Sequence, residues 1–146
     1  MSDVQASLAG MKVSLVLADA AAAHPDNTFS ILRGGISRIG APQNTPVTLI
    51  GAAVVFFHFD EADIGQHRPL VSLVDVPQRK LYIRAEIALD VKAAGFLHMI
   101  IPLRVQLPRD MQFTIDLTVG DKTLASWQLR SYTTEATPSA VSDGGA

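Results

Sequence analysis

The residues in this chain that could do chemistry are concentrated in one short acidic stretch. Asp60, Glu61 and Asp63 follow directly after a run of apolar residues that is typical of a β-strand. In ATP-dependent helicases an acidic motif in this position holds a magnesium ion, but it acts together with a G-x-x-x-x-G-K-[ST] loop that binds the phosphates. The sequence contains no Gly-Lys pair. A nucleotide site is therefore not expected here.

A capped turn of helix explains the same residues. We expect the Asp60 side chain to accept a backbone N–H at the start of one helical turn, with Asp63 three residues later. The helix dipole favours Glu61 in the first turn. The stretch is accordingly interpreted as a structural connector between two strands.

A metal site is the functional alternative for this connector. His58, Asp60, Asp63 and His67 offer imidazole and carboxylate ligands within one short segment. The sequence has no cysteine, no H-E-x-x-H motif and no calcium-loop pattern. We therefore favour an acidic loop in water, and we expect neither a metal nor a cofactor.

The remaining sequence offers no recognisable catalytic constellation. The G-x-S-x-G motif is absent and glutamate is scarce, so neither a serine hydrolase nor a paired-carboxylate glycosidase is indicated. Most aromatic residues lie in apolar contexts typical of a core, namely Phe56, Phe57, Phe59, Phe96, Phe113 and Trp127. Only Tyr82 and Tyr132 look available as exposed platforms. We expect a protein that is not an enzyme.

Composition excludes several classes of partner. The 146 residues carry a formal net charge of -2 without a cluster of Lys and Arg, so neither nucleic acid nor a membrane is an expected partner. The apolar run at residues 47–59 is too short for a helix that crosses a bilayer, which needs about 20 residues. A signal-like segment from Met11 is interrupted by Asp19. The absence of cysteine fits a cytoplasmic protein.

Alternation of apolar and polar residues predicts β-strands with one face on a core and the other in water. Three long segments carry it, at residues 80–91, 97–107 and 111–119. Shorter strands are expected at residues 11–17, 28–33, 36–39, 47–59, 70–76 and 123–131. The predicted fold is all-β: an antiparallel β-sandwich of about eight or nine strands, immunoglobulin-like or jelly-roll-like.

The long segments have predicted core faces. In residues 80–91 this face is Leu81, Ile83, Ala85, Ile87, Leu89 and Val91. In residues 97–107 it is Leu97, Met99, Ile101, Leu103, Val105 and Leu107. In residues 111–119 it is Met111, Phe113, Ile115, Leu117 and Val119, which leaves Thr114 and Asp116 facing water.

Turn residues and chain ends complete the predicted organisation. Gly34-Gly35 and Gly120-Asp121 are each expected at the tip of a hairpin. Pro102 has no N–H for a ladder hydrogen bond, so its strand should be an edge strand or bulged. We expect a flexible arm at residues 1–10, the sandwich domain at 11–132 and a flexible tail at 133–146.

The strand at residues 47–59 is apolar on both faces. A strand in a sandwich buries one face against the partner sheet, so something must cover the second. The cover is either internal, from the N-terminal arm or a loop, or it is another chain. The candidate interface is Ile50, Ala52, Val54 and Phe56.

Three stretches resemble a family of small, uncharacterised proteins found mainly in actinobacteria. They are LADAAAAHPDNTFSILRGGISRIG, FDEADIGQHRPLVSLVD and MQFTIDLTVGDKTLASWQLRSY, which together span most of residues 11–132. The resemblance implies a compact all-β domain with no known activity and no catalytic residues. It also places Asp60-Glu61-Ala62 within the family pattern, which favours the connector interpretation.

The expected function is therefore that of a non-catalytic interaction module. It would act as an oligomer, or as an accessory or structural component of a larger protein assembly such as a phage or cellular particle. Its partner would be protein, either itself or another component. The alternative is a β-sandwich that binds a small ligand or a glycan.

Overall fold

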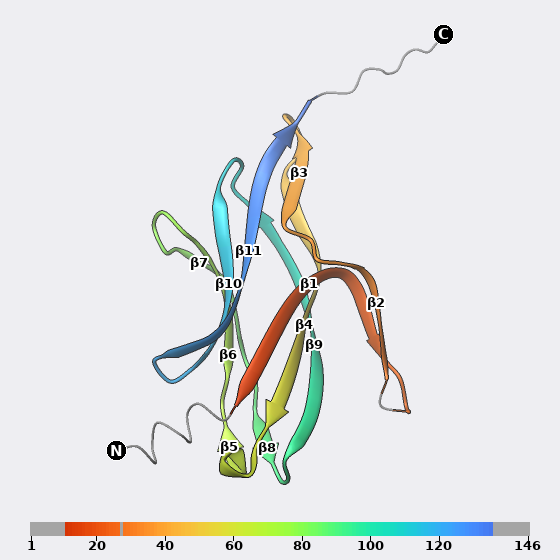
Figure 1. The fold of residues 1–146 in the computed structure, drawn as a ribbon. Coiled ribbons are helices and arrows are strands. Elements are labelled where there is room, and N and C mark those ends of the chain that lie inside the picture. The colour runs from red at the N-terminus through yellow and green to blue at the C-terminus, as the bar shows by residue number, and fades with distance from the viewer. Residues whose placement is uncertain (1–10, 27, 136–146) are drawn as a thin grey trace.

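The computed structural model describes residues 11–26 and 28–135, which form two facing β-sheets and a small two-stranded ribbon (Figure 1). The all-β sandwich is confirmed, with eleven strands in the described residues instead of eight or nine. They are β1 (Lys12–Ala23), β2 (Phe29–Gly34), β3 (Arg38–Pro42), β4 (Val47–Phe59), β5 (Gly65–His67), β6 (Leu70–Asp75), β7 (Leu81–Glu86), β8 (Leu89–Val91), β9 (Gly95–Leu107), β10 (Gln112–Val119) and β11 (Lys122–Thr134). Between β4 and β5 lies one 3-10 turn, Glu61–Asp63.

The ends of the domain differ slightly from the prediction. Strand β11 continues through Thr134, two residues past the predicted end of the domain, because Thr133 and Thr134 pair with β3. The predicted flexible arm at residues 1–10 lies outside the described residues, as does the predicted tail from residue 136 onward.

The two sheets differ in the direction of their strands. The first sheet has the order β2-β1-β4-β9 and is antiparallel throughout. The second has the order β3-β11-β10-β6-β7, and its β3 runs parallel to β11. The prediction of a purely antiparallel sandwich is corrected at this pair. Strand β3 enters the second sheet by a crossover from the first, and a crossover connection can deliver a strand parallel to its neighbour.

The core fills the space between the sheets. Its largest fully buried side chains are Phe57, Phe113, Leu17, Leu49, Leu73, Ile115, Leu117, Leu129, Val47, Val55 and Val71. Most of these sit at alternate positions of their strands, as the period of a half-buried strand requires. Each such side chain contributes about 1.5–3 kcal/mol when it leaves water.

The first predicted hairpin is instead the crossover between the sheets. Gly35 has a φ of 89°, which suits glycine, but the chain on either side belongs to different sheets. The backbone N–H groups of Gly35 and Ile36 both donate to the Leu17 carbonyl, at 2.8 and 3.0 Å. The second predicted hairpin is confirmed, since Val119 pairs with Lys122 across Gly120 and Asp121.

The predicted strand at residues 80–91 is two strands in different sheets. Strand β7 ends at Glu86, and β8 pairs with β5 in the ribbon. The pairing of β6 with β7 has a register shift, so that Leu73 pairs with Ile83 but Val74 pairs with Leu81. This shift reverses the predicted directions of the Leu81 and Tyr82 side chains. Leu81 is thereby 50% exposed, whereas the Tyr82 ring packs edge-on against Phe113 at 5.5 Å.

Strand β9 was predicted to be an edge strand or bulged at Pro102, and the structure shows the edge strand. It is the last strand of the first sheet and pairs with β4 from Gly95 to Leu107, with Pro102 opposite Ala52. Pairing continues through Pro102 without a register shift. The missing N–H of Pro102 therefore does not interrupt the ladder with β4.

Strand β1 bends away from β4 and folds over the outer side of the first sheet, the side turned away from the second sheet. It pairs with β4 from Lys12 to Ala18, and its second half pairs only with β2. Figure 1 shows this arch, with β2 running back beside it. A Cβ at Gly51 would lie 2.5 Å from the Ala18 carbonyl oxygen, so the bend requires glycine there.

Candidate functional site

The acidic stretch of Asp60, Glu61 and Asp63 forms the connection between β4 and β5. The predicted single turn is confirmed as one 3-10 turn at Glu61–Asp63, but the Asp60 side chain makes no capping hydrogen bond, contrary to the prediction. The Asp60 N–H donates to Asp63 Oδ2 at 2.7 Å, and the Asp63 N–H donates to the Asp60 carbonyl at 2.9 Å. Asp63 is buried whereas Asp60 is exposed. The buried carboxylate is therefore the one that holds the turn.

The four residues considered for a metal site do not assemble into one. His67 Nε2 lies 2.6 Å from the Asp63 carbonyl oxygen, and His58 stacks on Phe96 with ring centroids 4.5 Å apart. Within residues 11–26 and 28–135, no three His, Asp or Glu side chains are arranged to hold a metal ion.

The four residues of the candidate interface on β4 have very different exposures. Val54 is 0% exposed and Ala52 is buried, whereas Phe56 is half-buried and Ile50 is 57% exposed. Phe29 of β2 packs on Phe56 at 5.1 Å between ring centroids. The folded-over hairpin of β1 and β2 therefore covers much of this face within the same chain.

Beyond this cover the outer side of the first sheet carries an aromatic face, made up of Phe29, Phe56, His58, Phe96 and His98. Cross-strand pairing sets His58 opposite Phe96 and Phe56 opposite His98. The Phe29 ring also contacts His98 at 4.5 Å. The five rings come from β2, β4 and β9 and lie next to one another because these strands are adjacent or stacked.

Phe96 is the most exposed large apolar residue described, at 83%. Its interpretation as a core residue is therefore wrong. Alternation along β9 places Phe96 and His98 opposite to Leu97 and Met99, so the period of the strand already indicated an outward side chain. Phe96 was nevertheless predicted to lie in the core because its neighbours in the sequence are apolar.

The aromatic face is uncharged apart from its two imidazoles. The His58 and Phe96 rings are nearly parallel, with an interplanar angle of 12°, and form a flat platform. Such a surface can bury its rings against apolar groups and can offer imidazole nitrogens as hydrogen-bond donors or acceptors. It includes neither a carboxylate nor a hydroxyl group, and its polar side-chain atoms are the imidazole nitrogens of His58 and His98.

The outer side of the second sheet carries a polar cluster that is structural. Thr114 and Asp116, predicted to face water, are 5% and 8% exposed. The Thr114 and Ser126 hydroxyls donate to Asp116 Oδ1 at 2.8 and 2.7 Å, and Arg79 lies 3.7 Å from its other oxygen. Both oxygens of the buried Asp116 carboxylate therefore have partners, as a buried charged group requires.

A further buried aspartate, Asp75, lies at the turn between β6 and β7. Asp75 accepts the Gln78 N–H at 2.6 Å and the Tyr82 hydroxyl at 3.4 Å. Desolvation raises the pKa of the Tyr82 phenol above its usual value, and the charge of Asp75 adds to the rise.

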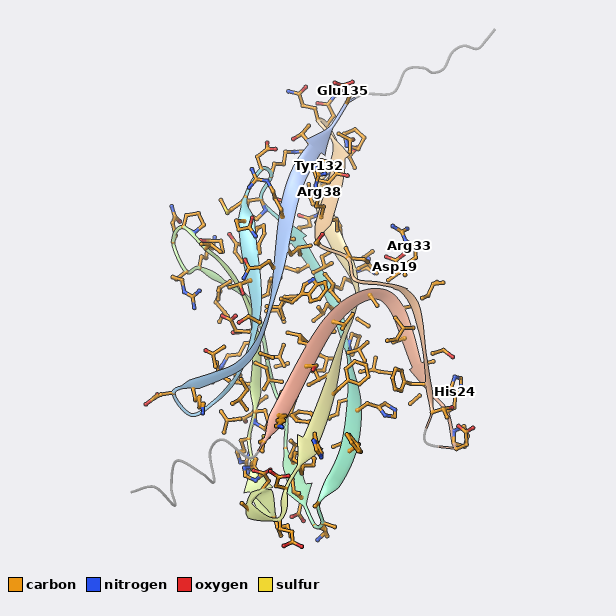
Figure 2. The ribbon with its side chains drawn as sticks, in the orientation of Figure 1. Asp19, His24, Arg33, Arg38, Tyr132 and Glu135 are labelled. Carbon is orange, nitrogen blue, oxygen red and sulfur yellow. The ribbon has the colours of Figure 1, made fainter. Side chains whose placement is uncertain are left out.

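Other charged side chains make contacts at the bend of β1 and near the ends of β3 and β11. Figure 2 shows Asp19 and Arg33 together at the arch of β1, where they form an ion pair at 3.2 Å. Arg38 lies 4.6 Å above the Tyr132 ring. The Arg109 guanidinium donates to the carbonyls of Ala41 and Pro42 at the end of β3 and of Thr45 in the connection to β4.

Comparison with known proteins identifies the family to which this chain belongs. The model of a family of unknown function, DUF6941, matches residues 13–131, and the chain belongs to this family. No curated protein matches the sequence. In the described part of the chain, no helix has the length and apolar character needed to span a membrane.

Proposed function

We propose that this member of the DUF6941 family is a non-catalytic interaction module that binds another protein through its aromatic face. The observation that carries the proposal is the outward position of Phe96, stacked on His58 beside Phe56 and His98. The chain would serve as an accessory or structural component of a larger assembly, such as a phage or cellular particle.

The energetics of exposed aromatic rings support this proposal. Burying a phenylalanine contributes about 1.5–3 kcal/mol, which is available to a partner only if the ring faces water beforehand. Aromatic side chains are enriched at the centres of protein interfaces, where a few residues carry most of the binding energy. Phe96 has the exposure and the neighbours of such an anchor.

The surroundings of the aromatic face also suit a protein interface. Lys12 and Ser14 of β1 lie opposite His58 and Phe56, and both are exposed. They supply a polar rim beside an apolar centre, as interfaces usually do. The net charge of -2 gives no support for nucleic acid as the partner, and the lack of cysteine suits a cytoplasmic assembly.

Site-specific photo-crosslinking in the native host tests the proposal. A benzophenone amino acid at position 58 should yield a discrete adduct with a different protein, and Phe96→Ala in the same chain should abolish it. The matched control carries the probe at position 81, because Leu81 is also exposed but lies on the second sheet. Equal labelling from positions 58 and 81 would refute the aromatic face as the docking site.

The flat stack of His58 and Phe96 favours one second candidate, a ligand with a ring that stacks on this platform, such as a sugar. Saturation-transfer NMR with monosaccharides and disaccharides would detect it. In that case the signal should disappear in Phe96→Ala, and position 58 should give no protein adduct.

A further inference from the structure

The free edge of β9 is a second surface of the first sheet that lacks a partner. Strand β9 pairs with β4 along its whole length, and no strand of the described chain pairs with its other edge. Unpaired N–H and C=O groups on an edge strand are a template for another strand. Natural sheets usually protect such edges with proline, charge or a bulge.

Only one half of this edge is protected. The second half carries Pro102 and Arg104, both exposed, which discourage pairing. The first half, residues 95–101, reads GFLHMII and contains no Asp, Glu, Lys or Arg. Within it Phe96 is 83% exposed, and Leu97 is 41% exposed although it faces the core side of the sheet.

The position of Pro102 shows which backbone groups face the free edge. Because the ladder with β4 continues through Pro102, the position without an N–H points away from β4. Backbone groups of a strand alternate between its two edges. Phe96, His98 and Ile100 have the same parity as Pro102, so their N–H and C=O groups face the free edge.

We propose that residues 95–101 pair antiparallel with the same residues of a second copy of this chain. The usable edge begins at Gly95, whose φ is 147°, and ends before Pro102, so its centre is His98. A two-fold axis at His98 sets Phe96 opposite Ile100 and Leu97 opposite Met99. Gly95 then faces Ile101, and Pro102 falls just outside the paired segment.

The absence of charged side chains in residues 95–101 favours a second copy of this chain as the partner strand. An edge segment without charged side chains offers a foreign strand no charge to complement, but it meets its own copy without like-charge repulsion. The outward groups of Phe96 and Ile100 would exchange hydrogen bonds, and Leu97 and Met99 would close the edge of the core. Two copies of the four-stranded first sheet would form one continuous sheet. The pairing uses the strand edge, so it does not depend on the proposed binding at the aromatic face.

Sedimentation equilibrium of the purified chain provides the first test. Wild type should sediment at twice the chain mass of 15.6 kDa. Ile100→Pro should be a folded monomer, because it removes an N–H that faces the free edge and leaves the ladder with β4 intact. Leu97→Lys should weaken association at least about tenfold, because it forces an ammonium group into the apolar contact between the two copies. Leu32→Lys is the control, since Leu32 is 62% exposed on β2, the opposite edge strand of the same sheet.

Disulfide trapping tests the register independently. The chain has no cysteine, so His98→Cys carries a single thiol at the predicted axis and should form a covalent dimer on mild oxidation. Leu32→Cys should not. A wild type that stays monomeric at about 100 µM would overturn the inference. The inference would also be overturned if the wild type were a dimer but His98→Cys formed no disulfide-linked dimer and Leu97→Lys did not weaken association. An adduct with a different protein from position 58 can occur in either case, so the two proposals fail separately.

Discussion

At the scale of single residues, the acidic stretch shows how one pattern can suggest catalysis and serve structure. Its carboxylates are divided between water and the interior: Asp60 is exposed, whereas Asp63 is buried and accepts the Asp60 N–H. A buried acceptor of this kind satisfies a backbone donor that water no longer reaches. The stretch therefore belongs to the joint between β4 and β5.

This division of roles leads to a prediction for the two aspartates. Asp63→Ala should lower the free energy of unfolding by about 1–2 kcal/mol, because it removes the cap of the turn and leaves a donor unpaired. Asp60→Ala should have a smaller effect, since its side chain faces water. Urea unfolding of both variants measures the difference. If Asp60→Ala proved the more damaging, the assignment of the cap to Asp63 would be wrong.

At the scale of elements, the hairpin of β1 and β2 decides what the outer side of β4 can do. It covers Val54 and leaves Ile50 at the surface, four positions away on the same face of the strand. The Ala18 carbonyl lies close to Gly51, and the exposed ion pair of Asp19 and Arg33 lies at the bend. Strand β4 can therefore be apolar on both faces, because the second sheet covers its inner face and the hairpin of β1 and β2 covers part of its outer face.

Substitution of lysine at these two positions tests the internal cover. Val54→Lys should lower the free energy of unfolding by about 3 kcal/mol or more, because it forces an ammonium group beneath the hairpin. Ile50→Lys should change it by no more than about 0.5 kcal/mol, because the side chain is 57% exposed. Thermal melts and urea titrations at one protein concentration make the comparison. Equal effects of the two substitutions would argue against the hairpin as the cover.

At the scale of the whole molecule, the crossover after β2 ties the two sheets together. Leu17 of the first sheet accepts two N–H groups from the crossover, and the Ile36 carbonyl accepts the indole N–H of Trp127 at 2.6 Å. Trp127 lies on β11 of the second sheet. One short segment therefore contacts both layers at once.

The only tryptophan of the chain makes this connection measurable. Trp127 fluorescence should change in a single transition on urea unfolding, at the same midpoint as the loss of β-structure in circular dichroism. The physical reason is that the indole environment depends on the crossover and thus on both sheets. A fluorescence midpoint clearly below the dichroism midpoint would show that the sheets separate before they unfold.

The sequence alone determined those features of the fold that depend on a few consecutive residues. The strand at residues 47–59, the hairpin at Gly120-Asp121 and the edge position of the strand containing Pro102 were all predictable. Side-chain alternation, turn chemistry and the missing proline N–H are properties of a few consecutive residues. The single helical turn after β4 follows from the same kind of local signal.

Only the tertiary structure decided which segments meet. Gly34-Gly35 has the residues of a hairpin, but hydrogen bonds to Leu17 make it a crossover. A register shift against β6 turns Tyr82 inward and Leu81 outward, and no residue within β7 announces it. Val54 is covered and Phe96 is left bare because a hairpin distant from both in sequence passes over one and stops short of the other. Burial depends on partners brought together by long-range pairing, and alternation along one strand carries no information about them.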